Sequence, residues 1–293
     1  MSKEMKSNVG SGTDVVTTEP GLEWVIGCEA LAAHVRAECL TMTHRAKSGH
    51  VGSMLSMADL LAVLYTRILR VDPANPRWAE RDRFILSKGH GGAAVFVVLA
   101  ELGFFPKDWL LRYYCDNGKL SGHISHHVPG VEFSTGSLGH GLPFAVGMAI
   151  AAARSGARHR IFCLLSDGDC DEGSTWEAVA FAAQHHLDNL TVIVDYNKIQ
   201  ALGFVKDVCD LEPFGDKVRA FRWAYREVDG HSVKAIDAAL AHLPFEPGRP
   251  SWLTANTIKG KGVSFLENTV SCHYGSVDDD QLAKALKELG ATV

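Results

Sequence analysis

The chain has 293 residues, 46% of them hydrophobic, enough for a substantial core in one large α/β domain or two small ones. Its 29 basic and 34 acidic residues give a formal net charge of −5, which excludes the broad basic field of proteins that bind nucleic acid or anionic membranes. The seven cysteines include no C-x-x-C pair, so neither a disulfide framework nor a zinc ribbon is indicated, and reduced cytoplasmic thiols are expected.

Residues 1–20 are polar and are expected to form a loose tail, without the apolar core of a signal peptide. No apolar run reaches the length of a transmembrane helix. No linker rich in proline, glycine or serine divides residues 21–293, so this range is predicted to be a single domain.

The N-terminal part predicts two helices separated by a loop that contains a histidine. Apolar residues recur at helical spacing from Leu22 to His44. The loop A-K-S-G-H-V-G-S follows, and a second helix is predicted to begin near M-A-D and to run over residues 59–69. The prolines of D-P-A-N-P-R-W then prevent the helix from continuing.

A short strand, Phe84 to Leu86, leads into a histidine between glycines. Gly89 and Gly91 flank His90 so closely that its imidazole can approach a phosphate or a reacting carbon. Helices are expected at 93–102 and 142–153.

The segment between these two helices contains four more histidines, three of which lie close together: His123, His126 and His127. No nearby cysteine completes a ligand set with them, which argues against a metal site there.

The centre of the chain predicts a β-α-β unit. Apolar runs of strand length cover 161–165 and 190–194, and a helical pattern covers 175–186. Parallel strands deliver their carboxyl ends to one edge of the sheet, where ligands usually bind. Asp167 and Asn197 each lie just beyond a strand, so we expect them to be neighbours.

Asp167, Asn197 and the carbonyl of Ile199 offer hard oxygen ligands, which suit Mg²⁺ or Ca²⁺ rather than zinc. Gly168 and Gly173 allow the backbone to come close to a phosphate. A purely structural alternative is an ordinary strand-to-helix turn at Asp167 and Gly168, with Asn197 capping the next element.

The C-terminal part continues the alternation of helices and strands. We expect a helix within 209–221, strands at 224–228 and 251–258, and an amphipathic helix after the phrase D-G-H. His231 of that phrase is interpreted as a turn or interface residue. Lys259 and Lys261 are interpreted as solvated.

Five motifs, in order, resemble the transketolase family: S-G-H at 48–50, R-D-R-F-I-L-S-K-G-H at 81–90, the segment from L-S-G-H to G-S-L-G at 120–139, S-D-G-D with D-Y-N-K-I at 166–199, and D-G-H at 229–231. The resemblance runs from Leu22 to Ser276. It implies an α/β fold with a parallel sheet covered by helices on both faces, which binds thiamine diphosphate through its diphosphate, as in the family's N-terminal half.

The resemblance also implies roles for individual residues. Catalytic roles fall to four histidines and to two glutamates that match the family's pair at the dimer contact: His50, His90, His123, His273, Glu172 and Glu177. The cofactor-binding set is His90, Gly136, Ser137, Leu138, Asp167, Gly168, Glu172, Asn197 and His273, and the metal set is Asp167, Asn197 and Ile199.

The chain departs from the family pattern at four positions. Ile124 stands where proline is common, His140 replaces a usual glutamine, and Ser166 replaces the first glycine of the diphosphate motif. Asn256 takes the place of a lysine in the phrase K-T-x-x-G-x-G, so one positive contact to the diphosphate is expected to be missing.

In full-length family members a second domain supplies the glutamate that activates the cofactor, and no segment here takes its place. The resemblance therefore implies a separate pyrimidine-binding partner subunit, in an α2β2 heterotetramer that mimics the family's homodimer. The implied reaction moves a two-carbon ketol unit from a ketose or ketose phosphate to an aldose. Two alternatives stay open: acyl transfer from a 2-oxo acid such as pyruvate, and a cofactor-binding subunit without catalytic activity.

Overall fold

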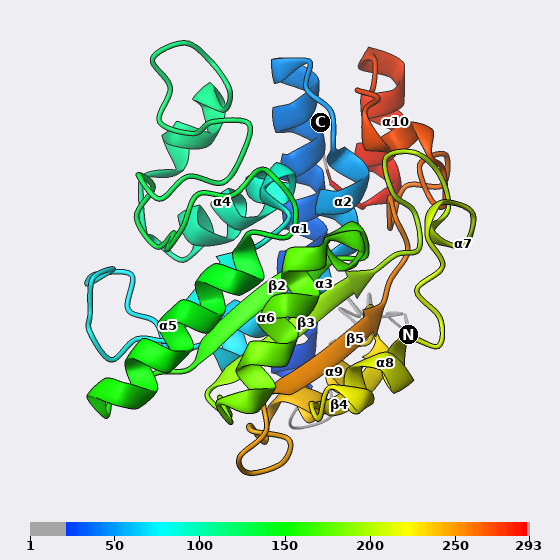
Figure 1. The fold of residues 1–293 in the computed structure, drawn as a ribbon. Coiled ribbons are helices and arrows are strands. Elements are labelled where there is room, and N and C mark those ends of the chain that lie inside the picture. Colours follow the sequence, from blue (N-terminus) through cyan, green and yellow to red (C-terminus); the bar gives the residue numbers. More distant parts are fainter. Residues whose placement is uncertain (1–21, 292–293) are drawn as a thin grey trace, which may run out of the picture.

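A parallel five-stranded sheet forms the centre of the computed structural model, which describes residues 22–291 (Figure 1). The predicted tail, residues 1–20, lies outside this range. The strands are β1 (Arg83–Leu86), β2 (Ile161–Ser166), β3 (Leu190–Tyr196), β4 (Ala224–Asp229) and β5 (Ser251–Asn256). Their spatial order is β1-β2-β3-β5-β4, and every pairing is parallel. The prediction of a parallel sheet is confirmed.

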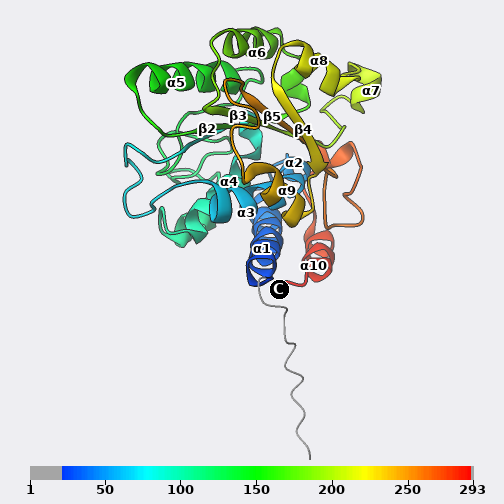
Figure 2. The ribbon, with the colours of Figure 1, turned by 90° about the horizontal axis from the view of Figure 1, so that it is seen from below.

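Helices cover both faces of the sheet, as Figure 2 shows. Side chains alternate along a strand, so Phe162 and Leu164 of β2 join one core, and Cys163 and Leu165 join the other. The first core is closed by α1 (Glu23–Ala46), α3 (Ala58–Val63), α4 (Gly92–Glu101) and α9 (Val233–Leu240). The second is closed by α5 (Gly141–Ser155), α6 (Gly173–Gln184) and α8 (Phe214–Ala220). Because both faces are buried, the central strands are nearly continuous apolar runs.

The remaining elements complete the fold. They are α2 (Val51–Ser56), a π-helical turn (Leu64–Ile68), α7 (Val205–Val208), α10 (Asp279–Glu288) and four 3₁₀ turns (Gly89–Gly91, Lys107–Arg112, Gly168–Asp171 and Ser271–His273). A third apolar cluster joins Leu40 of α1, Val51 and Leu55 of α2, and Ala285 of α10. This cluster holds the loop with the first histidine motif against the C-terminal helix.

One local prediction is wrong, because the loop predicted after α1 already contains α2. The helix expected over 59–69 is present as α3, which continues into a π-helical turn. The V-G-S-M-L-S sequence of α2 has no side-chain cap, but all six residues are buried, so packing rather than intrinsic propensity stabilises it. Within residues 22–291, no helix is long and apolar enough to cross a membrane.

Candidate active site

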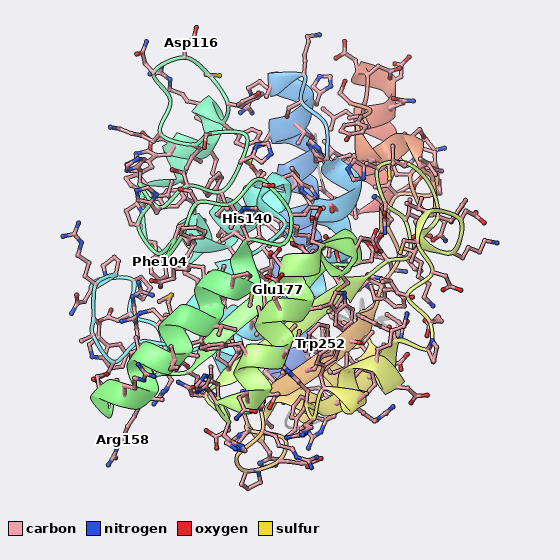
Figure 3. All side chains as sticks on the ribbon, in the orientation of Figure 1. Phe104, Asp116, His140, Arg158, Glu177 and Trp252 are labelled. Carbon is pink, nitrogen blue, oxygen red and sulfur yellow. The ribbon has the colours of Figure 1, made fainter. Side chains whose placement is uncertain are left out.

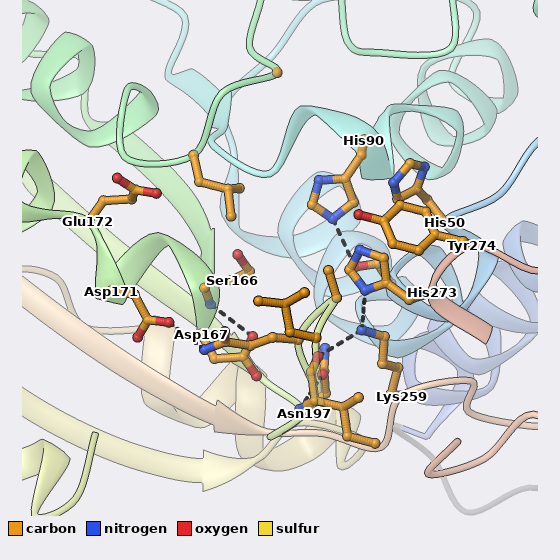
Figure 4. Close-up of a pocket in the computed structure, with 18 of the residues that line it drawn as sticks. His50, His90, Ser166, Asp167, Asp171, Glu172, Asn197, Lys259, His273 and Tyr274 are labelled. Carbon is orange, nitrogen blue, oxygen red and sulfur yellow. Dashed lines mark hydrogen bonds between the residues drawn. The ribbon is translucent and has the colours of Figure 1, made fainter. Parts of the chain in front are cut away.

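A pocket of about 330 Å³ lies at the carboxyl edge of the sheet (Figure 4). Asp167 follows β2 and Asn197 follows β3, and these two strands are paired side by side. Lys259 lies three residues beyond the end of β5, which pairs with the other edge of β3. All three residues line the pocket, so the expectation that Asp167 and Asn197 meet at one sheet edge is confirmed.

The oxygen atoms at this edge fit a hard divalent cation. Oδ1 of Asp167 accepts the N–H of Gly168, while Oδ2 is buried and has no hydrogen-bond partner. Oδ1 of Asn197 accepts the N–H of Ile199, which fixes the amide with its oxygen at the strand end. Burial, with the nearby charge of Asp195, raises the pKa of Asp167 to about 7. A bound cation would reverse that shift, because it favours the carboxylate.

Among residues 22–291, no three His, Cys, Asp or Glu side chains come together as a metal site. The His123, His126 and His127 side chains form no such group within this range. At the strand ends the protein offers one carboxylate, one amide oxygen and one carbonyl. A cation there would keep room for oxygen atoms of a bound phosphate, which is how Mg²⁺ is usually held.

A buried ion pair stands behind the pocket. Lys88 and Asp195, both fully buried, contact each other directly. Asp195 also accepts hydrogen bonds from Ser56 and Thr257. Although burial alone favours the neutral acid, the Lys88 ammonium and these hydroxyls hold the pKa of Asp195 below its ordinary value. These contacts connect β1, α2, β3 and the end of β5 beneath the pocket floor.

Lys259 is buried rather than solvated, which corrects the interpretation from the sequence. Its side chain is 1% exposed, and its Nζ lies 2.7 Å from the carbonyl oxygen of Ile199 and 2.7 Å from Nδ1 of His273. Burial lowers its pKa to about 8. Lys259 thus places a positive charge in the pocket although Asn256 replaces the family's lysine. The K-G-K-G phrase gave no sign of which lysine turns inward.

Four histidines gather on one side of the pocket. The ring centroid of His50 lies 4.9 Å from that of His90, 5.3 Å from that of His273 and 6.2 Å from that of His123. The N–H of His50 donates to the carbonyl of His273 at 2.7 Å, which ties their two loops together. His50 has a φ of 71°, an uncommon conformation for a residue other than glycine. The four residues from separate motifs are brought together as the resemblance implies.

Three of these imidazoles are held in the neutral form. Burial, and then the positive charge of Lys88, hold the pKa of His90 well below its ordinary value. Burial and the Lys259 charge lower the pKa of His273 to about 3. Burial, with His123 and Lys259, also lowers the pKa of His50. Neutral imidazoles can each donate and accept a hydrogen bond, which suits a ligand rich in hydroxyl groups.

The His123 segment is fixed against the His90 turn. Gly89 lies close to Thr135, and a Cβ added at Gly89 would be 2.1 Å from the Thr135 carbonyl oxygen, so only glycine fits here. The N–H of Ile124 donates to the carbonyl of Gly89 at 2.9 Å. A proline at 124 has no N–H to make this bond. The departure at Ile124 therefore adds a contact that holds His123 in the pocket.

Most of the residues singled out by resemblance line the pocket, and two do not. Ser137 is exposed beside it, and Glu177 is exposed on α6, where Figure 3 labels it. Glu172 precedes α6 and lines the pocket. The sequence did not single out six further lining residues: Ser53, Asp171, Gln200, Ala201, Leu202 and Tyr274. Ser53 lies within one helical turn of His50, and its Oγ is 3.3 Å from Nε2 of His90.

Residues 28–292 match the family model described as transketolase, thiamine diphosphate binding domain. A protein of Actinobacillus succinogenes, named as one of the subunits of apulose-4-phosphate transketolase, is 44% identical over 82% of this chain and 87% of its own length. A Clostridium protein named 6-deoxy-6-sulfo-D-fructose transketolase subunit SqwG is 41% identical over 82% and 88%.

Solved structures give the same likeness over a smaller share of their length. The transketolases of Leishmania mexicana and Campylobacter jejuni, 30% and 31% identical, both superpose with a TM-score of 0.85 over 90% of this chain. The chain spans 41% and 43% of those two proteins. It corresponds in length to the named subunits and to about two fifths of the transketolases of solved structure.

Proposed function

The chain belongs to the transketolase family, as its thiamine-diphosphate-binding domain, and from this premise we propose that it is the cofactor-binding subunit of a two-component transketolase. The observation that carries the proposal is the pocket, where oxygen ligands, a buried ammonium and four imidazoles face one space. The chain spans most of the length of each named subunit, which supports the two-component form.

The anionic end of thiamine diphosphate would lie where the pocket's charges are. Asp167, Asn197 and the carbonyl of Ile199 would hold Mg²⁺ or Ca²⁺, and Lys259 would neutralise the diphosphate. Gly136 and Leu138 also line the pocket, and Gly168 follows the first ligand. We assign His90 and His273, whose rings lie 5.7 Å apart, to the same end of the cofactor.

When bound, thiamine diphosphate supplies a nucleophilic carbon and an electron sink for cleavage of the bond beside a ketone. The protein has to orient the ketose and move protons at its hydroxyl groups. His50 and His123 lie at the open side of the pocket, and an imidazole there can exchange a proton with a hydroxyl. A partner subunit that covers this open side would exclude water from the reacting atoms.

The donor is proposed to be a ketose or ketose phosphate and the acceptor an aldose. A row of hydrogen-bonding imidazoles suits a polyol better than the short, anionic chain of a 2-oxo acid. The alternative of acyl transfer from pyruvate gains no support from these relatives, whose names refer to transketolases.

The partner is proposed to carry the pyrimidine-binding domain and the glutamate that activates the cofactor. Glu172 and the exposed Glu177 are assigned to the contact between copies of the chain, in an α2β2 assembly. Leu202, 86% exposed, and Tyr274, 66% exposed, lie at the rim of the pocket, where a partner would cover them. The cytoplasmic location suggested by the seven free thiols stays a prediction.

Reconstitution tests this proposal. The purified chain should bind thiamine diphosphate in the presence of Mg²⁺, yet should turn over xylulose 5-phosphate only when a second protein with a pyrimidine-binding domain is added. The rate should rise to a plateau near an equimolar ratio of the two components. Full turnover by the chain alone would refute the two-component form, and turnover of pyruvate in place of the ketose would refute the substrate class.

A further inference from the structure

His231 belongs to a buried network that ends at the cofactor pocket without lining it. Its Nδ1 lies 2.8 Å from Oδ2 of Asp59, and its Nε2 accepts the backbone N–H of Ile258 at 2.8 Å. The His231 and Asp59 side chains are only 12% and 7% exposed. His231 stands in the turn before α9, as the sequence suggested, but this contact reaches 172 residues back along the chain.

These two contacts fix the protonation of the ring. A backbone N–H can only donate, so Nε2 must present its lone pair to Ile258. The proton therefore sits on Nδ1, where the Asp59 carboxylate accepts it. Arg36 pairs with both carboxylate oxygens of Asp59 and so holds that carboxylate in its ionised form.

The network also sets the position of a pocket residue. Ile258 immediately precedes Lys259, whose ammonium contacts the Ile199 carbonyl and His273. Past the lysine, the N–H of Gly260 donates to the carbonyl of Gly52 in α2. The Lys259 backbone is thus held on one side by His231 and on the other by α2.

Arg36 also stabilises α2, the second of the two elements that hold the Lys259 backbone. Nε of Arg36 donates to the carbonyl of Leu55 at 3.1 Å, so α1 holds α2 as well as Asp59. Arg36, Asp59 and His231 come from three separate elements, α1, α3 and the turn before α9, and all act on the segment that carries Lys259.

We propose that His231 is a positioning residue, which uses its neutral, Nδ1-protonated ring to fix the Ile258 N–H and thereby places the Lys259 ammonium against the diphosphate of the cofactor. The inference rests on the proposed function, since it assigns an anionic ligand to Lys259. It adds a residue outside the pocket to the determinants of cofactor affinity, and it predicts that His231 acts only through Lys259.

The first test observes the ring directly. In the full chain labelled with ¹⁵N-histidine, nuclear magnetic resonance at pH 7 should show one neutral imidazole protonated on Nδ1, whose signals vanish in His231→Gln. A ring protonated on Nε2, or on both nitrogens, would overturn the inference because neither state can accept the Ile258 N–H.

The second test compares two substitutions by calorimetry with thiamine diphosphate and Mg²⁺. His231→Gln keeps an acceptor at the position of Nε2 and should bind within about threefold of the wild type. His231→Asn reaches Asp59 but not Ile258, and should bind about 10- to 100-fold more weakly, as is common for groups that orient a binding residue. His242→Asn is the matched control, an exposed histidine just beyond α9.

The third test is a double-mutant cycle with Lys259→Met. If His231 acts through the lysine, His231→Asn should cost less than about twofold in affinity once Lys259 is absent. Full additivity, or equal losses in the Gln and Asn variants that follow their melting temperatures, would overturn the positioning role and leave the proposed function intact. Failure of the wild-type chain to bind the cofactor would instead overturn the proposed function, and this inference with it.

Discussion

Replacing Lys259 by methionine should strengthen the fold and weaken the binding of the cofactor. Burial lowers the pKa of this ammonium from 10.5 to about 8. At about 1.4 kcal/mol for each pKa unit, carrying the charge at pH 7 costs the folded state on the order of 3 kcal/mol. Methionine has a similar length and no charge, but it leaves the Ile199 carbonyl without its donor, a loss of about 1 kcal/mol. The net expectation is a gain of about 2 kcal/mol.

The pH dependence has a defined sign. Because the folded pKa lies below the unfolded one, the penalty is fully present below pH 8 and disappears as the pH rises from there to the unfolded value. Urea denaturation should therefore show the variant more stable at pH 7, with the advantage gone near about pH 10.

The affinity should change in the opposite direction. Two unit charges about 4 Å apart attract by about 4 kcal/mol at the effective dielectric constant of a partly buried site. With a pKa of about 8 the amine is already mostly protonated at pH 7, so the variant should lose most of this attraction, about 3 kcal/mol, roughly 100-fold in Kd for thiamine diphosphate by calorimetry.

Lys261→Met is the matched control. The Lys261 side chain is 34% exposed, and its Nζ comes no closer than 3.7 Å to Oε1 of Glu267, which makes a weak ion pair. Its loss should therefore change stability and affinity by less than about 0.5 kcal/mol. A Lys259→Met chain that is less stable at pH 7 would show that the ammonium stabilises the fold. A chain that binds the cofactor as tightly as the wild type would show that the ammonium does not contact the ligand.

Three further predictions concern the metal, the substrate and the fold. Asp167→Ala and Asn197→Ala should each abolish the Mg²⁺-dependent part of cofactor binding in calorimetry while the chain stays folded; unchanged affinity in both would contradict the metal assignment. His123→Ala should lower kcat with the partner present by about 10²-fold or more and change cofactor affinity little, whereas a collapse of cofactor binding would misplace this residue. Asp82→Asn should destabilise the fold by about 2 kcal/mol at pH 7. Burial alone would raise the pKa of this carboxylate, but its contacts with Arg160 and Arg70 outweigh burial and lower the pKa. That difference should shrink as the pH falls below about 4, since the stabilisation exists only while the carboxylate is ionised; a constant difference down to pH 2 would contradict it.

The sequence predicted the central part of the fold because local patterns determine it. The runs that became β2 and β3 are apolar over strand length and end in Ser166 and Tyr196, directly before the polar residues Asp167 and Asn197. Parallel pairing follows from the helix between them, and it brings the two strand ends together without further information. Local apolar patterns likewise predicted α5 and α9.

Long-range packing decided what the sequence could not show. Lys259 and Lys261 occupy equivalent places in a K-G-K-G phrase, and contacts with α2 and with the loop after β3 turn the first inward. The contact between Asp59 and His231 joins residues far apart in sequence, so no local pattern reports it. α2 is too short to be recognised from its periodicity, and it forms because its neighbours bury it.

Two buried pairs of opposite charge at one sheet edge respond differently to burial, and the difference points to a ligand. Asp195 and Lys88 contact each other directly, and the pKa of Asp195 stays below its ordinary value, so this pair is satisfied within the protein. Asp167 and Lys259 are also buried, yet the carboxyl pKa rises to about 7 and the ammonium pKa falls to about 8. Each of the two is thus driven towards its neutral form, which a ligand of opposite charge reverses. A divalent cation at Asp167 and a diphosphate at Lys259 would supply both charges at once, and their binding free energy would offset the instability that this pair imposes on the free chain.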